Sequence, residues 1–150
     1  MTPSADGQPE GAEAERDLER LLADLRPALA PEPYVFVAAP RDAGGEAAPP
    51  NDPPPFAVVR EEEGTTWIVR RRQADAAGLP YVFVAARITL RVPSALDAVG
   101  LTAAVATRLA RAGIACNVIA GLRHDHLLVP LERADDALDL LTSLWGPGAT

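Results

Sequence analysis

The residues best suited to chemistry lie together in the segment His124-Asp125-His126. On an extended chain the two imidazoles would point to the same side, which suits two metal ligands. A zinc site normally needs three or four ligands, and no Cys, Asp or Glu cluster at ligand spacing completes this set. The simpler interpretation is a hairpin in which Asp125 binds turn amides and His126 packs at the start of a strand. A metal-dependent hydrolase using His124 and His126 is therefore the least favoured function.

The single cysteine, Cys116, is no better as a nucleophile. Its neighbours Gly113, Ile114, Ala115 and Val118 are apolar, and no cationic side chain beside it would stabilise a thiolate. No serine is marked as a nucleophile by its surroundings either. We predict that Cys116 is a reduced, buried strand residue and that the chain has no catalytic residue, metal or cofactor.

The charge balance argues against polyanionic partners. Fourteen basic and 21 acidic residues give a net charge of −7, which repels phosphate backbones and anionic lipid. The basic run at 70–72 is opposed by the acidic run at 61–63 across a predicted hairpin, as on a solvated rim. Residues 1–15 lack the features of a secretion signal, and no apolar segment approaches bilayer length. We expect a cytoplasmic protein that binds neither nucleic acid nor membrane.

Apolar spacing and turn residues divide the first half of the chain into short elements. Residues 1–15 bury too little apolar surface to fold, which predicts a disordered tail. Leucines recur every three or four residues from Leu18 to Leu29, which predicts a helix that Pro27 and Pro31 terminate. We then expect a strand at 34–39, a proline-rich loop at 40–55, a hairpin of 56–62 and 65–70, helical turns at 71–77 and a strand at 81–92. The length of this last strand suggests that it crosses from one sheet unit into the next.

The second half has a clearer pattern. A helix ending at Gly113 presents Leu101, Val105 and Leu109 on one face. We then expect a strand at 114–120, a turn at 121–125, a strand at 126–130 and a second amphipathic helix at 134–144. Antiparallel strands with both helices on one face bury a single apolar layer, so the predicted fold class is an α+β sandwich.

One internal repeat is visible in the chain. Residues 33–39 and 80–86 both read Pro-Tyr-Val-Phe-Val-Ala-Ala. Seven identical residues favour duplicated strands in two related units, and the alternative is coincidence between strands of similar composition. The two copies continue differently, since Pro40 opens a loop whereas Arg87 continues a strand.

Several segments together resemble the ACT domain. They are Arg-Ile-Thr-Leu-Arg-Val-Pro-Ser at 87–94, Ala-Val-Gly-Leu at 98–101 and Ala-Gly-Ile-Ala-Cys-Asn-Val at 112–118. The chain is also similar, more narrowly, to a bacterial family of tandem ACT-domain proteins of uncharacterised function. The segments that carry this similarity are Arg-Glu-Glu-Glu-Gly-Thr at 60–65, the continuation of the second segment to Val105, and His124-Asp125-His126.

This resemblance covers roughly residues 16–145 and implies a ferredoxin-like βαββαβ sandwich in each of two units. The domains would be a tail at 1–15, a degenerate N-terminal unit at 16–86 and a C-terminal unit at 87–150. The first unit has no recognisable first helix, because the insert at 40–55 stands in its place. The second unit has no obvious final strand.

The resemblance also implies an amino-acid site at the loop before a unit's first helix and the strand facing it. Free N–H groups at a helix start attract a carboxylate, and Gly100 would let a ligand approach the backbone. Asn117 interrupts an apolar strand, where a buried amide needs a partner. The predicted ligand-binding residues are Ser94, Val99, Gly100, Leu101, Asn117, Val118 and Ile119.

Each of these assignments has an alternative. Ser94 could open a capping box, or Asp97 could cap a helix beginning at Ala98, and we favour the second. Gly100 could instead serve close helix-to-sheet packing, and Asn117 could bind neighbouring backbone.

The favoured function is a sensing or regulatory protein for an amino-acid-like ligand, without catalysis. We expect it to form a homo-oligomer and to act on a regulated protein partner, because no catalytic or DNA-binding domain is attached. The second hypothesis is a scaffold without ligand that dimerises through exposed sheet edges.

Overall fold

One antiparallel sheet runs through the whole molecule in the computed structural model, which describes residues 14–143. Its strands follow the order β5-β6-β2-β7-β9-β8, and β1 pairs with β7 as well. The elements of this sheet are β1 (Pro27–Leu29), β2 (Tyr34–Ala38), β5 (Ala57–Glu61), β6 (Gly64–Arg70), β7 (Val82–Leu90), β8 (Asn117–Ala120) and β9 (Asp125–Pro130). The helices are α1 (Leu18–Ala23), α2 (Arg71–Ala76), α3 (Leu101–Arg111), the short 3-10 helix η1 (Leu131–Arg133) and α4 (Ala134–Ser143).

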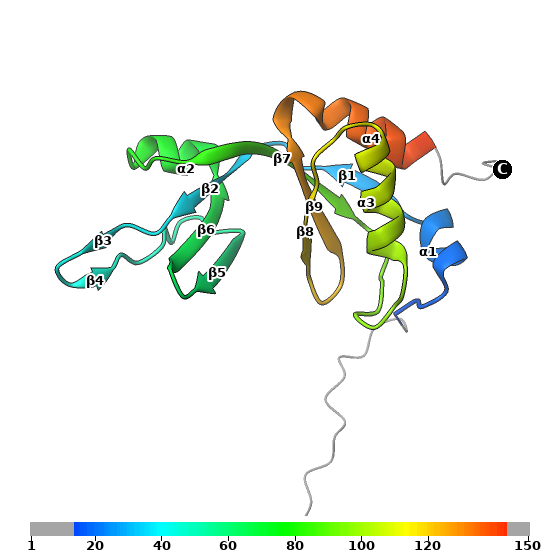
Figure 1. Ribbon diagram of the computed structural model, residues 1–150, viewed down its shortest axis with the longest axis horizontal. Helices are drawn as coiled ribbons and strands as arrows, with labels where there is room; N and C mark the ends of the chain where they lie inside the picture. Colours follow the sequence, from blue (N-terminus) through cyan, green and yellow to red (C-terminus); the bar gives the residue numbers. More distant parts are fainter. Residues whose placement is uncertain (1–13, 144–150) are drawn as a thin grey trace, which may run out of the picture.

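Strand β7 belongs to both halves of the sheet (Figure 1). Its first residues pair with β2, with Tyr34 opposite Ala85, and its last three residues pair with β1. The pairing with β2 shifts register at a bulge, where Phe83 has a φ of 55°. The expected crossing of a long strand between units is therefore correct, and the bulge increases the local twist at the crossing.

The second unit consists of β7, α3, β8, β9 and α4, and its fourth strand is β1. In the order β1-β7-β9-β8, this borrowed strand occupies the edge beside β7. The unit that lacked a final strand in the sequence is thus completed by the N-terminal segment. Helix α1 comes with it, because Leu21 and Leu25 lie in the same buried cluster as Leu109 of α3 and Leu141 of α4.

The first unit has the same strand order, β7-β2-β6-β5, but fewer helices. Only the six-residue α2 covers its inner face in the described part of the chain, where Ala74 packs with Val35, Val37, Trp67 and Val69. As expected, β2 is not followed by a first helix. A two-stranded hairpin, β3 (Arg41–Asp42) and β4 (Gly45–Glu46), takes that place and projects from the end of the molecule (Figure 1).

Polar contacts attach this hairpin to the sheet. The carboxylate of Glu46 accepts hydrogen bonds from the backbone N–H of Thr65 at 2.9 Å and from its hydroxyl at 2.6 Å. The Thr65 hydroxyl bond is the main cause of a lowered pKa for Glu46. The hairpin is therefore attached through the carboxylate of Glu46 and not through an apolar helix face.

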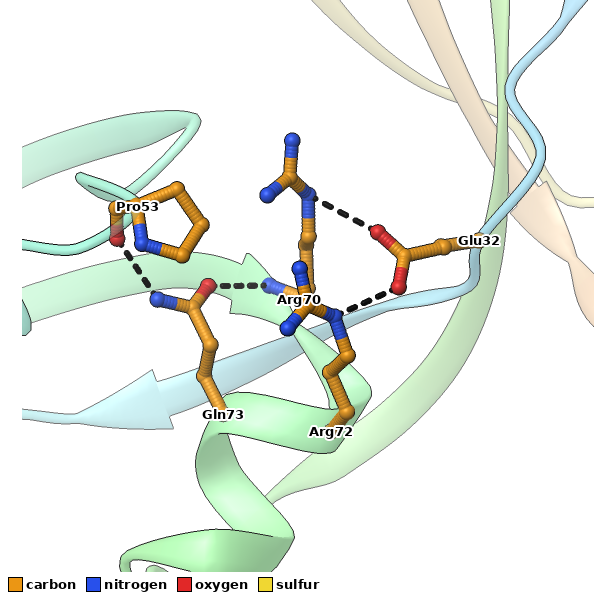
Figure 2. A network of polar contacts seen from close by, with 5 residues as sticks. All are labelled: Glu32, Pro53, Arg70, Arg72 and Gln73. Carbon is orange, nitrogen blue, oxygen red and sulfur yellow. Dashed lines mark hydrogen bonds and ion pairs between the residues drawn. The ribbon is translucent and has the colours of Figure 1, made fainter.

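A second polar network fixes the junction of β6 and α2 (Figure 2). The carboxylate of Glu32, in the link between β1 and β2, pairs with the guanidinium groups of Arg70 and Arg72. The side chain of Gln73 accepts from the backbone N–H of Arg70 at 3.2 Å and donates to the carbonyl of Pro53. The link, the helix start and the proline-rich segment are thus held together at one point.

The helix-free face of the sheet carries an aromatic cluster that joins the two units. The Arg87 guanidinium lies 4.5 Å from the Phe56 ring centroid and 4.8 Å from that of Tyr34. Phe56 contacts the His126 ring edge to face, with centroids 5.0 Å apart. Because Phe56 adjoins β5 while His126 lies in β9, this cluster connects opposite halves of the sheet.

Several expected boundaries were wrong. The leucine repeat from Leu18 to Leu29 predicts one helix that Pro27 and Pro31 terminate, but α1 ends at Ala23 and Leu29 lies in β1. Strand β8 begins at Asn117 and not at Ile114. Residue 15 was expected in the tail, yet the backbone N–H of Glu15 donates to the carbonyl of Pro93. Residues 1–13 of the predicted tail, and residue 144 of the last helix, lie outside the described residues.

Candidate functional site

The start of α3 has backbone N–H groups that no side chain caps among the described residues. Gly100 is the N-cap residue, with φ 104°, and its carbonyl accepts from the N–H of Ala104 at 2.9 Å. Within residues 14–143 no side chain caps this helix. The amides of Leu101, Thr102 and Ala103 therefore lack helical partners, which leaves a positive helix end open to an anion.

Both capping predictions for this helix were wrong. The carboxylate of Asp97 pairs with Arg16 at 3.0 Å, and the hydroxyl of Ser94 donates to Asp125 across 3.4 Å. The N-terminal segment brings Arg16 into place, so the residues next to Asp97 gave no sign of the competing partner. The helix begins three residues later than expected, after Gly100, whose left-handed backbone suits glycine.

Gly100 also has a packing role. A Cβ added there would lie 2.9 Å from Cδ2 of Leu18, so α1 closes over this turn. The alternative role predicted for Gly100, close packing, is therefore supported, although Gly100 packs against helix α1 and not against the sheet. The side of Gly100 that faces α1 is therefore not available to a ligand.

The other side of the loop is open and apolar. Val99 is 84% exposed and Leu96 is 68% exposed, which is high for aliphatic side chains in a folded protein. Leu122, in the turn between β8 and β9, is 69% exposed. The bond between Ser94 and Asp125 ties that turn to the loop, so exposed apolar side chains and the start of α3 lie at the same end of the second unit (Figure 1).

The predicted strand residues do not join this group. Asn117 pairs with Leu128, whereas Ala120, three residues on, lies at the Asp125 end near Ser94. At roughly 3.3 Å per residue, Asn117 lies about 10 Å farther along the strand. Its expected burial is also wrong, since Asn117 is exposed at the start of an edge strand. Val118 packs toward the helix layer, and Ile119 toward the aromatic cluster on the opposite face.

His126 and Cys116 are explained by their surroundings without any reactive role. His126 Nδ1 lies 3.0 Å from the hydroxyl of Thr89, and burial is the main cause of its lowered pKa. Burial also raises the pKa of the Cys116 thiol to about 11, so the thiol stays protonated. Residues 14–143 contain no group of three His, Cys, Asp or Glu side chains placed to hold a metal.

The ACT domain family matches this chain twice, over residues 13–86 and over residues 85–143. The chain belongs to the ACT-domain family. Two ACT domains lie in tandem, each with the ferredoxin-like strand order described above. The predicted boundary between them, at residue 86, falls inside the shared strand β7.

Solved structures share this arrangement. A Vibrio cholerae protein of unknown function, described as a possible transport protein, is 40% identical, with a TM-score of 0.72 over 85% of this chain and 95% of its own. An Agrobacterium tumefaciens protein is 20% identical, with a TM-score of 0.64 over 80% of this chain and 88% of its own. The ligand-free regulatory subunit of aspartate kinase from Thermus thermophilus is 11% identical, with a TM-score of 0.58 over 80% of this chain and 97% of its own. The last two likenesses show the fold alone.

No curated protein matches the chain significantly. In the part of the chain that the structure describes, no helix is long and apolar enough to cross a bilayer.

Proposed function

We propose that this tandem ACT protein is a regulatory module that binds a small amino-acid-like ligand at the start of α3. The observation that carries the proposal is the uncapped helix end, where the amides of Leu101, Thr102 and Ala103 have no helical partner. A ligand carboxylate would accept hydrogen bonds from these amides, since helix N-termini favour anions. The relative from Thermus thermophilus is itself described as a regulatory subunit, which supports the same class of function.

The exposed apolar side chains of the loop before α3 are the other groups that the ligand would contact. Val99 and Leu96 are exposed apolar side chains in the loop that leads into α3, and a ligand that covered them would gain stability by removing apolar surface from water. Of the predicted site residues, Val99, Gly100 and Leu101 belong to this end of the unit. Ser94 holds the loop in place through its hydrogen bond to Asp125. Asn117, Val118 and Ile119 lie on β8 and do not belong to the start of α3.

Regulation would follow from differential affinity for two arrangements of the protein. The site adjoins α1, because Leu18 packs on Gly100, so a bound ligand would also restrict the N-terminal segment. Only a ligand that binds one arrangement more tightly can shift the population and so signal to a protein partner.

The experiment is a thermal-shift screen of the full chain against the proteinogenic amino acids at millimolar concentration, followed by calorimetry of each positive. A ligand at about 100 times its Kd should add roughly 2.7 kcal/mol of stability. Val99→Glu should abolish binding, because the new carboxylate competes for the free amides. Val82→Glu is the matched control, since Val82 is 70% exposed and adjoins the first unit. If none of the amino acids stabilises the protein, the proposal is wrong.

A second candidate function, a dimerising scaffold, is favoured by the sheet edge at β5. Val58 is 42% exposed and Val59 is 45% exposed on this edge strand, whose backbone groups could pair with another copy. Val59→Lys should then convert a dimer to a monomer in light scattering. A monomeric wild-type protein at all concentrations would exclude this function.

A further inference from the structure

An open cavity lies where β1 meets the end of β7. It has a volume of about 520 Å³, within the usual range of small-molecule sites. Its lining residues are Arg26, Pro27, Ala28, Thr89, Arg91 and His124. Three of these side chains carry cationic or protonatable nitrogen, and none of the six is acidic.

Two arginines face each other across this strand pair. Pro27 pairs with Leu90, and the N–H of Arg91 donates to the carbonyl of Arg26 at 3.2 Å, so Arg26 and Arg91 are directly opposite. Like charges in such a cross-strand position repel and destabilise the pair. A bound anion between the guanidinium groups would remove this cost.

Nearby carboxylates pair with only some of the basic side chains that line the cavity. Asp24 pairs with Arg26, whereas Arg91 has no ion-pair partner among the described residues. Asp125, the neighbour of His124, is engaged by the hydroxyl of Ser94. One guanidinium and one imidazole therefore remain available in a protein whose net charge is −7.

The framework of the cavity is fixed. The hydroxyl of Thr89 is oriented by His126 Nδ1 at 3.0 Å. Arg26 has a φ of 43°, an unfavourable conformation for a residue with a side chain, and the turn from α1 into β1 holds it there. The two arginines come from segments far apart in the sequence, so the site exists only because β1 completes the second unit.

We propose that this cavity is a second binding site, which takes a small organic anion through a carboxylate or phosphoryl group. Arg26 and Arg91 bind the anion oxygens with charge-assisted hydrogen bonds, and His124 and Thr89, which line the same cavity, supply further polar contacts. Thr89 projects from the helix-free face, so this site is distinct from the amides at the start of α3 and does not depend on the proposed function.

The test is an NMR titration of the full-length, ¹⁵N-labelled protein with inorganic phosphate and, separately, with succinate. Ionic strength is held constant with chloride. The amide signals of Thr89, Arg91 and His124 should shift, and those of Thr102 and Ala103 should not. Arg91→Gln should weaken binding about tenfold or more, which corresponds to the loss of one charge-assisted hydrogen bond.

Two further variants keep the outcome clear. Arg26→Gln should also weaken binding, whereas Arg60→Gln, which removes the same charge from exposed strand β5, should leave it within about twofold. A response to phosphate alone assigns a phosphoryl ligand, and a response to succinate alone assigns a carboxylate. The proposed site is overturned if neither anion shifts these signals at roughly 20 mM, a concentration well above a millimolar Kd. It is also overturned if the Arg91→Gln variant binds the anion as well as the wild type does. Val99→Glu should leave anion binding intact, which separates this result from the amino-acid experiment.

Discussion

The two ACT units of this chain share one strand order and differ in what covers the strands. The second unit buries a large cluster between its sheet and α3, α4 and the N-terminal α1. The first unit has one six-residue helix, and a hairpin replaces the helix that should follow β2. Strand pairing alone therefore preserves this architecture, while the helices decide where apolar surface is buried and where a helix end is free to bind a ligand.

The repeated heptapeptide makes the same point at the level of single residues. Val35 in the first copy is fully buried in β2, whereas the equivalent Val82 in β7 is 70% exposed. Both copies form the first strand of a unit, and they lie next to each other in the sheet. Identical residues thus have different surroundings, because β7 must also serve as the last strand of the first unit.

The largest expected effect tests whether the N-terminal segment is part of the second unit. Leu21→Ala should lower the free energy of unfolding by about 2–5 kcal/mol, since Leu21 is fully buried in the cluster that also contains Leu109 of α3. Leu29→Ala, at a residue 38% exposed, should cost less than about 1 kcal/mol. Urea unfolding measures both, and equal costs would mean that α1 is not part of the core.

A smaller effect tests the connection between the units. Arg87→Ala should cost about 1–2 kcal/mol, because it removes two cation–π contacts and the packing of the side-chain stem. The Nε of Arg87 is buried without a hydrogen-bond partner among the described residues, which limits the loss. Arg60→Ala on the exposed β5 edge is the control in the same urea series. A cost no larger than that of the control would show that the cluster contributes little.

The same cluster should make stability depend on pH. Burial and the nearby charge of Arg87 lower the folded-state pKa of His126, so the unfolded chain binds a proton more readily. The contribution is complete above the unfolded pKa of about 6.5 and is lost as the pH falls toward the folded value. The urea midpoint should therefore drop between about pH 7.5 and about pH 5.5, values that bracket a pKa of about 6.5. His126→Gln should reduce this drop more than His124→Gln does.

The smallest effect concerns the ion pairs that join the first unit to the link before β2. Glu32→Gln should cost about 1 kcal/mol or less, because the carboxylate and both arginines are partly exposed. The cost should shrink in high salt. Glu62→Gln, at an exposed residue of the β5–β6 turn at the other end of β6, should have no measurable effect on the urea midpoint. A loss much larger than predicted would mean that the network in Figure 2 supports the first unit's core.

Local patterns along the chain were enough to predict the type and order of most elements and the α+β class. Apolar residues that recur every two residues predict strands, and those that recur every three to four residues predict helices. These patterns, and the turns at Gly64, Gly78 and Gly113, depend only on near neighbours in the sequence. The motifs also indicated the ACT family and the missing first helix, and the length of the strand at 81–92 indicated the crossing role of β7. A loop before α3 was predicted from the sequence, whereas the residue that caps this helix, Gly100, was not.

The remaining features depend on contacts between distant segments. Only long-range pairing could make β1 the fourth strand of the second unit, bring Arg16 to Asp97 and set Arg26 opposite Arg91. For the same reason Asn117 is exposed, because edge position and strand direction are properties of the sheet and not of the residues around it. Alternation along a strand sets which face a side chain takes, whereas the neighbours on that face come from segments far away in the chain.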